Sequence, residues 1–202
     1  MINESSWAWV PPPPPMVITS DFINSGYLGL AAAGPKSIAG PGGAGGASLK
    51  IDSPTVVING TLSMNGEAPK FNFAGGGAGG SVIIAATSLT GSGTISAKGG
   101  DSDYAGDATT NLKSPAGAGG LIHLQDITTL DFQGTVSAAG GTGTNGGSDG
   151  SAGVVILPNN FNLTVKSGKT WVLGEGAYSL ASLTIENGGT LKTGIDQSSS
   201  TG

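Results

Sequence analysis

A repeated unit, in which apolar runs alternate with glycines, is the feature that most constrains this chain. Each unit begins with Ala-Gly-Gly and an alternating apolar run, and the three long copies are residues 44–66, 78–100 and 118–141. Each also contains Gly-Thr-aliphatic-Ser-x-x-Gly, starting at Gly60, Gly93 and Gly134. A fourth start precedes residues 154–157. Fixed apolar runs separated by polar insertions of varying length indicate stacked coils that carry loops.

The C-terminal part repeats over a shorter length. Leu163-Thr164-Val165-Lys166-Ser167-Gly168 recurs twenty residues later as Leu183-Thr184-Ile185-Glu186-Asn187-Gly188. Twenty residues suit one coil of a parallel β-helix without an inserted loop. The chain is therefore predicted to be all-β: a right-handed parallel β-helix (β-solenoid) with glycine-rich loops and an extended N-terminal arm. The apolar alternation assigns four residues to its stacked core: Val82, Ile84, Leu89 and Ile95.

Four regions follow from these patterns. They are a Trp/Pro-rich N-terminal arm (1–25), a glycine-rich β-solenoid with long loop insertions (26–160), short-period coils (161–194) and a flexible tail (195–202). The prolines of the arm predict a stiff polyproline II rod. Aromatic side chains are good interface anchors, so we interpret the arm as an assembly anchor; the alternative is a disordered terminus. The anchor residues are Trp7, Trp9, Pro11, Pro12, Pro13, Pro14 and Pro15.

Composition narrows the class of partner. The chain has 38 Gly and 11 Pro in 202 residues, but 37% of its residues are hydrophobic and only 10% are charged, which favours a glycine-tolerant β architecture over disorder. Eight Lys, no Arg and a net charge of −5 give no basic cluster for nucleic acid. The absence of Cys excludes disulfides and thiolate metal sites. No apolar run reaches membrane-spanning length and no signal peptide is recognised, so no membrane insertion is expected.

Glycine motifs that match nucleotide-binding patterns are interpreted as backbone features. Gly75, Gly77 and Gly80 read as G-x-G-x-x-G, but a phosphate-binding turn must open a helix, and the run 81–84 predicts a strand. This cluster is instead interpreted as a corner between coils, in which glycine serves backbone geometry and close approach. Ser167-Gly168-Lys169-Thr170 resembles the end of a Walker A loop but lacks its leading glycine. Asn-Gly pairs at 59–60, 65–66, 145–146 and 187–188 are expected to be corners with positive φ.

An acidic loop is the only candidate metal site. Asp101, Asp103 and Asp107 are weak candidates for Ca²⁺, which prefers several oxygen ligands from a flexible loop. The spacing lacks the Glu of a full EF-hand, and a solvated acidic loop is the alternative. Apart from this possible Ca²⁺, no cofactor is predicted.

Catalytic candidates are few. Two carboxylate pairs merit inspection for glycoside hydrolysis, Asp126 with Asp131 and Glu175 with Glu186. His123 is the only histidine, and the alternation places it on the opposite side of its strand from the flanking Ile122 and Leu124. A catalytic histidine needs nearby partners, so no catalytic residue is predicted.

The repeated pattern of Ala-Gly-Gly, a strand and TGSGTISAKGG resembles the glycine-rich β-solenoid repeats of large bacterial surface proteins and of phage tail fibres and adhesins. The resemblance covers about Ala44 to Gly194. It implies a rigid, protease-resistant scaffold, often trimeric in virions, whose loops or tip make contacts. It supplies no catalytic residues.

These observations predict a non-enzymatic structural protein of a phage virion: a tail-fibre, tailspike-like or capsid-decoration component. Its partners would be other virion proteins, bound through the arm, further copies of itself, with a trimer favoured, and a host surface glycan or protein. A fragment of a secreted bacterial surface adhesin or extracellular fibre, located at the cell surface, is the alternative. A polysaccharide-degrading β-helix enzyme is a third.

Overall fold

The chain is all-β with parallel sheets, as the alternating apolar runs predict. The computed structural model describes residues 15–18, 22–23, 41–70, 74–102, 114–143, 147–174 and 177–193, with the backbone alone for 22–23. Within these ranges the chain forms sixteen strands and no helix. All the strand pairings found in these ranges are parallel.

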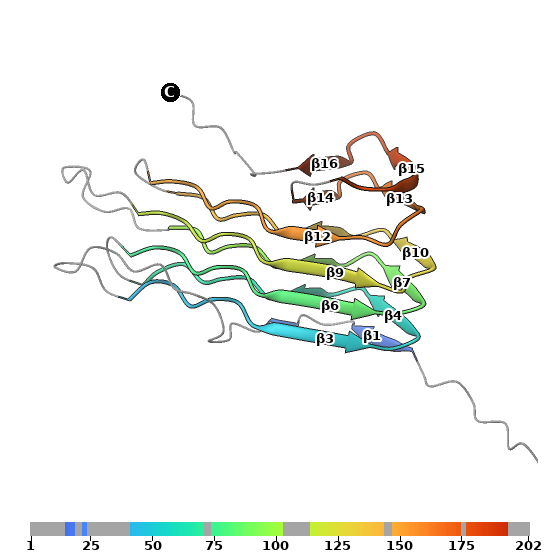
Figure 1. Cartoon of the computed structure of the whole chain (residues 1–202), viewed down its shortest axis with the longest axis horizontal. Helices are drawn as coiled ribbons and strands as arrows, with labels where there is room; N and C mark the ends of the chain where they lie inside the picture. The colour runs from blue at the N-terminus through green and yellow to red at the C-terminus, as the bar shows by residue number, and fades with distance from the viewer. Residues whose placement is uncertain are drawn as a thin grey trace, which may run out of the picture.

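The strands belong to three long sheets and one pair, and their order follows a simple rule (Figure 1). The first sheet contains β1 (Met16–Ile18), β4 (Thr55–Ile58), β7 (Ser88–Gly91) and β10 (Thr129–Phe132). The second contains β2 (Phe22–Ile23), β5 (Thr61–Ser63), β8 (Thr94–Ser96), β11 (Thr135–Ser137), β14 (Thr170–Leu173) and β16 (Thr190–Thr193). The third contains β3 (Ser48–Asp52), β6 (Ser81–Ala85), β9 (Leu121–Gln125) and β12 (Val154–Ile156). The pair is β13 (Phe161–Val165) with β15 (Leu180–Ile185).

The sequence repeats are also the structural repeats. Each strand from β1 to β9, and also β11, pairs with the strand three places further along the chain, whereas β13 and β14 pair with the strand two places further. The Gly-Thr-aliphatic-Ser motif forms β5, β8 and β11, in which Leu62, Ile95 and Val136 are aligned across the sheet. The twenty-residue repeat aligns Leu163 with Leu183. The change from long to short units in the sequence therefore marks a change from three strands to two per unit.

The core lies between the sheets and is built from columns of aligned aliphatic side chains. Val82, Ile84, Leu89 and Ile95, which the alternation assigns to the core, have no exposed surface. Ile122 and Leu124 extend the columns of Val82 and Ile84 in the next strand. Burial of these columns is the main hydrophobic contribution to stability.

Trp171 is the largest fully buried side chain and lies in the first two-strand unit. It continues the column of Val136, and its ring is 6.5 Å from that of Phe132 at an interplanar angle of 57°. Its indole Nε1–H donates to the carbonyl oxygen of Gly134 at 3.0 Å, which satisfies a donor that would otherwise be buried without a partner.

A second body of backbone without regular strands extends from the sheets (Figure 1). We call it the glycine slab. Its approach segments lead into β3, β6, β9 and β12, and its exit segments leave β5, β8 and β11. The approach segments are residues 41–47, 74–80, 114–120 and 147–153, and the exit segments are 64–70, 97–102 and 138–143.

Backbone hydrogen bonds join each approach segment to its neighbours at intervals of three residues. The amides of Gly76 and Gly79 donate to Pro115 and Ala118 of the next approach segment, at 3.0 and 2.8 Å. The amides one residue later, those of Gly77 and Gly80, donate to exit-segment residues Glu67 and Met64 at 2.9 and 2.7 Å. Three residues per turn is the period of the polyproline II conformation, which forms no hydrogen bonds within a single chain. Here neighbouring segments supply the partners.

This packing explains the Ala-Gly-Gly repeat. A Cβ atom on Gly79 would collide with the carbonyl oxygen of Ala97, and one on Gly80 with that of Ala47. Ala78, at the third position of the turn, is only half-buried and accommodates its methyl group. In this turn two positions of three, Gly79 and Gly80, therefore face another backbone and leave no room for a side chain.

Two sequence interpretations of glycine are corrected by this arrangement. The cluster Gly75–Gly80 is not a corner between coils but an extended segment bonded to two neighbours, and it leads into a strand rather than a helix. Of the Asn-Gly pairs, Gly188 has positive φ (84°), but Gly60 and Gly66 do not; their amides donate to Ile18 and Lys98 of neighbouring units. The pair at 145–146 lies outside the described residues.

We expect Gly77→Ala to destabilise the protein by about 3 kcal/mol, at the upper end of overpacking costs. The new methyl group would collide with the carbonyl oxygens of Ala44 and Gly43, which are held by the slab. The free energy of unfolding in urea measures the effect. Gly168→Ala is the control, since no atom lies within 4 Å of its Cβ position and only its φ of 70° opposes the change. Equal losses in the two variants would contradict the close-packing explanation.

We expect Trp171→Phe to cost about 1–3 kcal/mol, because the substitution keeps an aromatic ring but removes the donor to the buried Gly134 carbonyl. Urea unfolding gives the loss of stability. Unchanged stability would show that the indole hydrogen bond makes no net contribution.

Candidate binding surface

The outer face of the sheet formed by β3, β6, β9 and β12 is a candidate binding surface, and we call it the β3–β12 face. Side chains that alternate with the core columns form rows across it. One row is Ser48, Ser81, Leu121 and Val154, and the next is Lys50, Ile83, His123 and Ile156. Because the strands are parallel and in register, equivalent residues of successive units lie side by side.

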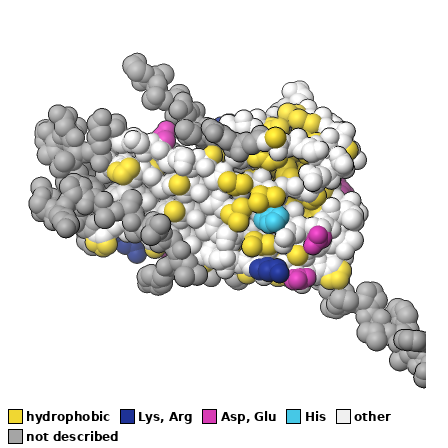
Figure 2. Space-filling view, in the orientation of Figure 1, with side chains coloured by type: hydrophobic (Ala, Val, Ile, Leu, Met, Phe, Trp, Pro, Cys, Tyr) yellow, Lys and Arg dark blue, Asp and Glu magenta, His cyan; other side chains and the backbone are white. Residues whose placement is uncertain are grey.

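This face is apolar towards β12 and polar towards β3. Val154 and Ile156 are 48% and 41% exposed, whereas Lys50 forms an exposed ion pair with Asp52 at 3.8 Å. Figure 2 shows hydrophobic side chains gathered around the histidine, with charged side chains to one side. An exposed ion pair of this kind contributes little stability. The free energy available from contact with a partner therefore lies mainly at the β12 end, where exposed aliphatic side chains would be buried.

His123 lies in the middle of this face. Its neighbours in register are Ile83 and Ile156, while Ile122 and Leu124 point into the core, as the sequence alternation predicts. In the part of the chain that the structure describes, no three His, Asp or Glu side chains cluster as a metal site. The histidine is therefore a polar group within an aliphatic row rather than a member of a charged cluster.

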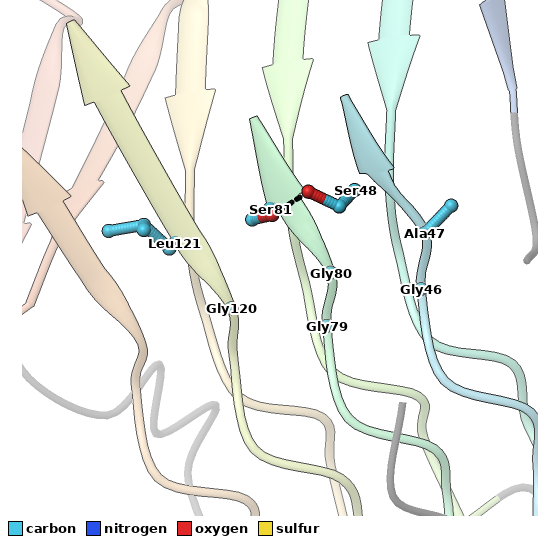
Figure 3. Close-up of a pocket in the computed structure, with 8 residues that line it drawn as sticks. All are labelled: Gly46, Ala47, Ser48, Gly79, Gly80, Ser81, Gly120 and Leu121. Carbon is cyan, nitrogen blue, oxygen red and sulfur yellow. Dashed lines mark hydrogen bonds between the residues drawn. The ribbon is translucent and has the colours of Figure 1, made fainter. Parts of the chain in front are cut away.

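A shallow groove of about 330 Å³ crosses the beginning of the same strands, where the slab joins the sheet (Figure 3). It exists because glycines carry no side chains there. Its lining consists of Gly46, Ala47, Ser48, Gly79, Gly80, Ser81, Gly120 and Leu121. The Ser48 and Ser81 hydroxyl oxygens are hydrogen-bonded at 2.6 Å, and the amides of Gly79, Gly80 and Gly120 are used by the slab. The serine hydroxyls are thus the side-chain groups that can hydrogen-bond a hydroxylated ligand here.

A second hollow of about 250 Å³ adjoins the apolar end of the face. It is lined by residues 154–159 and 177–179. The Tyr178 hydroxyl donates to the Gly174 carbonyl at 2.9 Å, and burial raises the pKa of this tyrosine. The ring is therefore fixed beside β12 and remains neutral at physiological pH.

Asp101 is the one calcium candidate that lies within the described residues, and its carboxylate has a structural role. Lys98 Nζ lies 3.0 and 3.2 Å from the two carboxylate oxygens of Asp101, and the Thr142 amide donates to Oδ1 at 2.7 Å. The bond from Thr142 joins two exit segments of the slab, and the bonds from Lys98 hold the Asp101 carboxylate within its own segment. Asp103 and Asp107 lie outside the described residues.

Three of the four carboxylates considered for glycoside hydrolysis lie in the described residues. Asp126 is an exposed turn residue with φ of 57°, and Asp131 accepts a hydrogen bond from Gln133 Nε2 at 3.1 Å. Glu186 accepts from Lys166 Nζ at 2.7 Å and from the Ser167 amide at 3.2 Å. Glu175, the partner considered for Glu186, lies outside the described residues.

The Lys166–Glu186 ion pair was missed by reasoning from the sequence, although a signal for it was present. The two residues occupy the same position of the twenty-residue repeat, directly after the aligned Val165 and Ile185. Equivalent residues of adjacent units are neighbours, so opposite charges at one repeat position indicate an ion pair between units. The hydrogen bond from Lys166, followed by that from the Ser167 amide, lowers the pKa of Glu186.

The predicted assembly anchor is almost wholly outside the described residues. Trp7, Trp9, Pro11, Pro12, Pro13 and Pro14 lie beyond them, and Pro15 is exposed directly before β1. Ser167–Thr170 forms the turn and the start of β14 rather than a phosphate loop, and Gly168 has φ of 70°.

Comparison with protein families, curated proteins and solved structures finds no match to this chain. Among the residues that the structure describes, no helix is long and apolar enough to cross a membrane.

We expect the Lys166–Glu186 pair to stabilise the fold above the ordinary carboxyl pKa of 4.5 and to lose this effect as the pH falls through the lowered folded value. The unfolded chain binds the proton first, so acidification favours unfolding. The difference in unfolding free energy between the native protein and Glu186→Gln should be constant above about pH 6 and shrink below about pH 4.5.

Carboxyl NMR titration of Glu186 provides the direct measurement. Lys166→Met should return its pKa towards 4.5, because the largest cause of the shift is removed. A titration unaffected by Lys166→Met would contradict the assignment.

Proposed function

We propose that the chain is a right-handed parallel β-helix whose coils are widened on one side by the glycine slab. Parallel pairing of each strand with the strand three places on supports this proposal. The aligned core columns do so as well. We infer the right-handed sense of the β-helix because crossover connections between parallel strands are almost always right-handed.

We infer that its function is structural and non-enzymatic, as a rigid support that holds surface segments away from the β-helix. The observation that carries this inference is the slab, in which backbone hydrogen bonds connect neighbouring approach and exit segments. The sequence joins the exit segments to the next approach segments through residues 71–73, 103–113 and 144–146. The described ends of the slab lie away from the strands (Figure 1), so these three connections start and end at its far edge.

The use of charged residues also fits a structural role. Lys98 holds Asp101 within one exit segment, Asp101 accepts from the Thr142 amide of the next exit segment, and Lys166 and Glu186 tie adjacent short units. Ionic groups placed between repeats stabilise the stack rather than prepare a reacting group.

The setting that we propose is a phage virion, in a tail fibre, tailspike-like protein or capsid decoration. The arm would bind other virion proteins and the far edge of the slab a host surface glycan or protein. A homotrimer is the favoured assembly. This setting is proposed because the Ala-Gly-Gly repeat resembles the repeats of tail fibres and bacterial adhesins. A bacterial surface adhesin is the alternative.

We expect deletion of residues 1–15 to prevent incorporation into the particle without changing the thermal stability of the β-helix, because β1 starts at Met16. Immunogold labelling and mass spectrometry of purified particles measure incorporation, and circular dichroism measures stability. Deletion of residues 195–202 is the matched control and should be incorporated normally. Full incorporation without the arm would contradict its role as an anchor. Labelling of the bacterial surface alone would support the adhesin instead.

A further inference from the structure

We propose that copies of this chain stack end to end, the last strands of one copy pairing with the first strands of the next. The evidence lies at the two ends of the described stack, where no other described residue covers the residues in core positions. This assembly is independent of what the far edge of the slab binds.

The C-terminal end presents a surface of core type. Leu183 and Ile185 of β15 are aligned with Leu163 and Val165, which are 1% and 0% exposed, yet each is itself 47% exposed. Leu191 of β16 is aligned with the fully buried Trp171 and is only partly buried. These side chains cover the previous unit, and no further unit among the described residues covers them.

The N-terminal end carries the matching pattern. In β1, Met16 and Ile18 are aligned with the fully buried Val56 and Ile58, and Met16 is 40% exposed. Val17 lies between them and points outward. The order core, outward, core in Met16–Ile18 is the same as that in Leu183–Ile185. Pairing these strands in this register would join apolar positions to apolar positions, and a shift of one residue would expose them.

Topology makes the two ends complementary. β2 and β16 are the opposite edge strands of one six-stranded sheet, and β1 is an edge strand of its own sheet. β15 is the free strand of its pair with β13, which contacts β10 and so continues the side of the stack that begins with β1. Figure 1 places β1 and β15 at opposite ends of the stack. The pairings in the described stack are parallel. Translating a second copy along the stack would therefore place its β1 beside β15 and its β2 beside β16, with the strands running in the same direction.

Two of the edge strands, β1 and β15, also lack the features that prevent such pairing, whereas β16 contains Lys192. Natural edge strands are commonly protected by charged residues or proline. Neither Met16-Val17-Ile18 of β1 nor Leu180-Ala181-Ser182-Leu183-Thr184-Ile185 of β15 contains either. A second copy is therefore the occupant that fits: it offers parallel strands, alternate aliphatic side chains and the same spacing between units. Because this contact joins two different surfaces, it extends to linear oligomers rather than closing as a dimer.

Sedimentation velocity of the full chain, from low micromolar to submillimolar concentration, tests the proposal. We expect the wild-type protein to form a concentration-dependent series of oligomers. Leu183→Lys should weaken association about a hundredfold, because the ammonium would be buried without a partner at the junction. Thr184→Lys, on the same strand but pointing outward, should associate like the wild type. Thermal melting controls for folding, and both variants should melt near the wild-type temperature.

Disulfide cross-linking provides a second test that does not depend on weakening the interface. The chain has no native Cys, and Val17 and Thr184 point outward at matching positions of the proposed junction. The double variant Val17→Cys, Thr184→Cys should give a ladder of covalent dimers, trimers and longer chains on mild oxidation, whereas either single variant should not. A monomeric wild-type protein, a closed trimer unaffected by Leu183→Lys, or a double variant that gives no ladder would overturn the proposal.

Discussion

Backbone hydrogen bonding between successive units is the interaction on which the rest of this structure depends. In the sheets it takes the familiar parallel form, and the bonds carry aliphatic columns into the core. In the slab, amides three residues apart bond neighbouring segments, and the absence of side chains lets the backbones approach. Glycine usually destabilises ordered structure because it has the most conformational freedom to lose. Here the hydrogen bonds between neighbouring segments of the chain offset that loss of conformational freedom.

The two kinds of packing place different demands on sequence, and this determines how much could be foreseen. The strands and their core positions could be predicted because alternation is visible in a single unit, as in Ser81–Ala85 with Val82 and Ile84 buried. The Gly75–Gly80 segment could not be assigned in the same way. A glycine that forms a corner and a glycine that faces another backbone are the same letter, and the difference lies in partners such as Glu67 and Pro115, which are distant in sequence.

The candidate surface was foreseen less well than the fold, for a related physical reason. The His123 alternation was readable, but its row with Ile83 and Ile156 emerges only when the glycines that precede the strands of successive units are aligned. The Lys166–Glu186 pair lies where the repeat has no insertion, and there the register can be read by counting. Sequence repeats therefore locate contacts between units by counting where their length is constant and by motif alignment where it varies.

The regular stacking that stiffens the molecule also affects its ends. In a stack of similar units, each added unit covers the core side chains of the previous unit and exposes its own. Natural repeat proteins often resolve this with a terminal unit of polar outer surface. Leu183 and Ile185, in the last described unit, keep the aliphatic pattern of the preceding unit instead, and each is 47% exposed. The buried part of each side chain covers Leu163 and Val165, and the exposed part gains free energy only when a further unit or a second copy covers it.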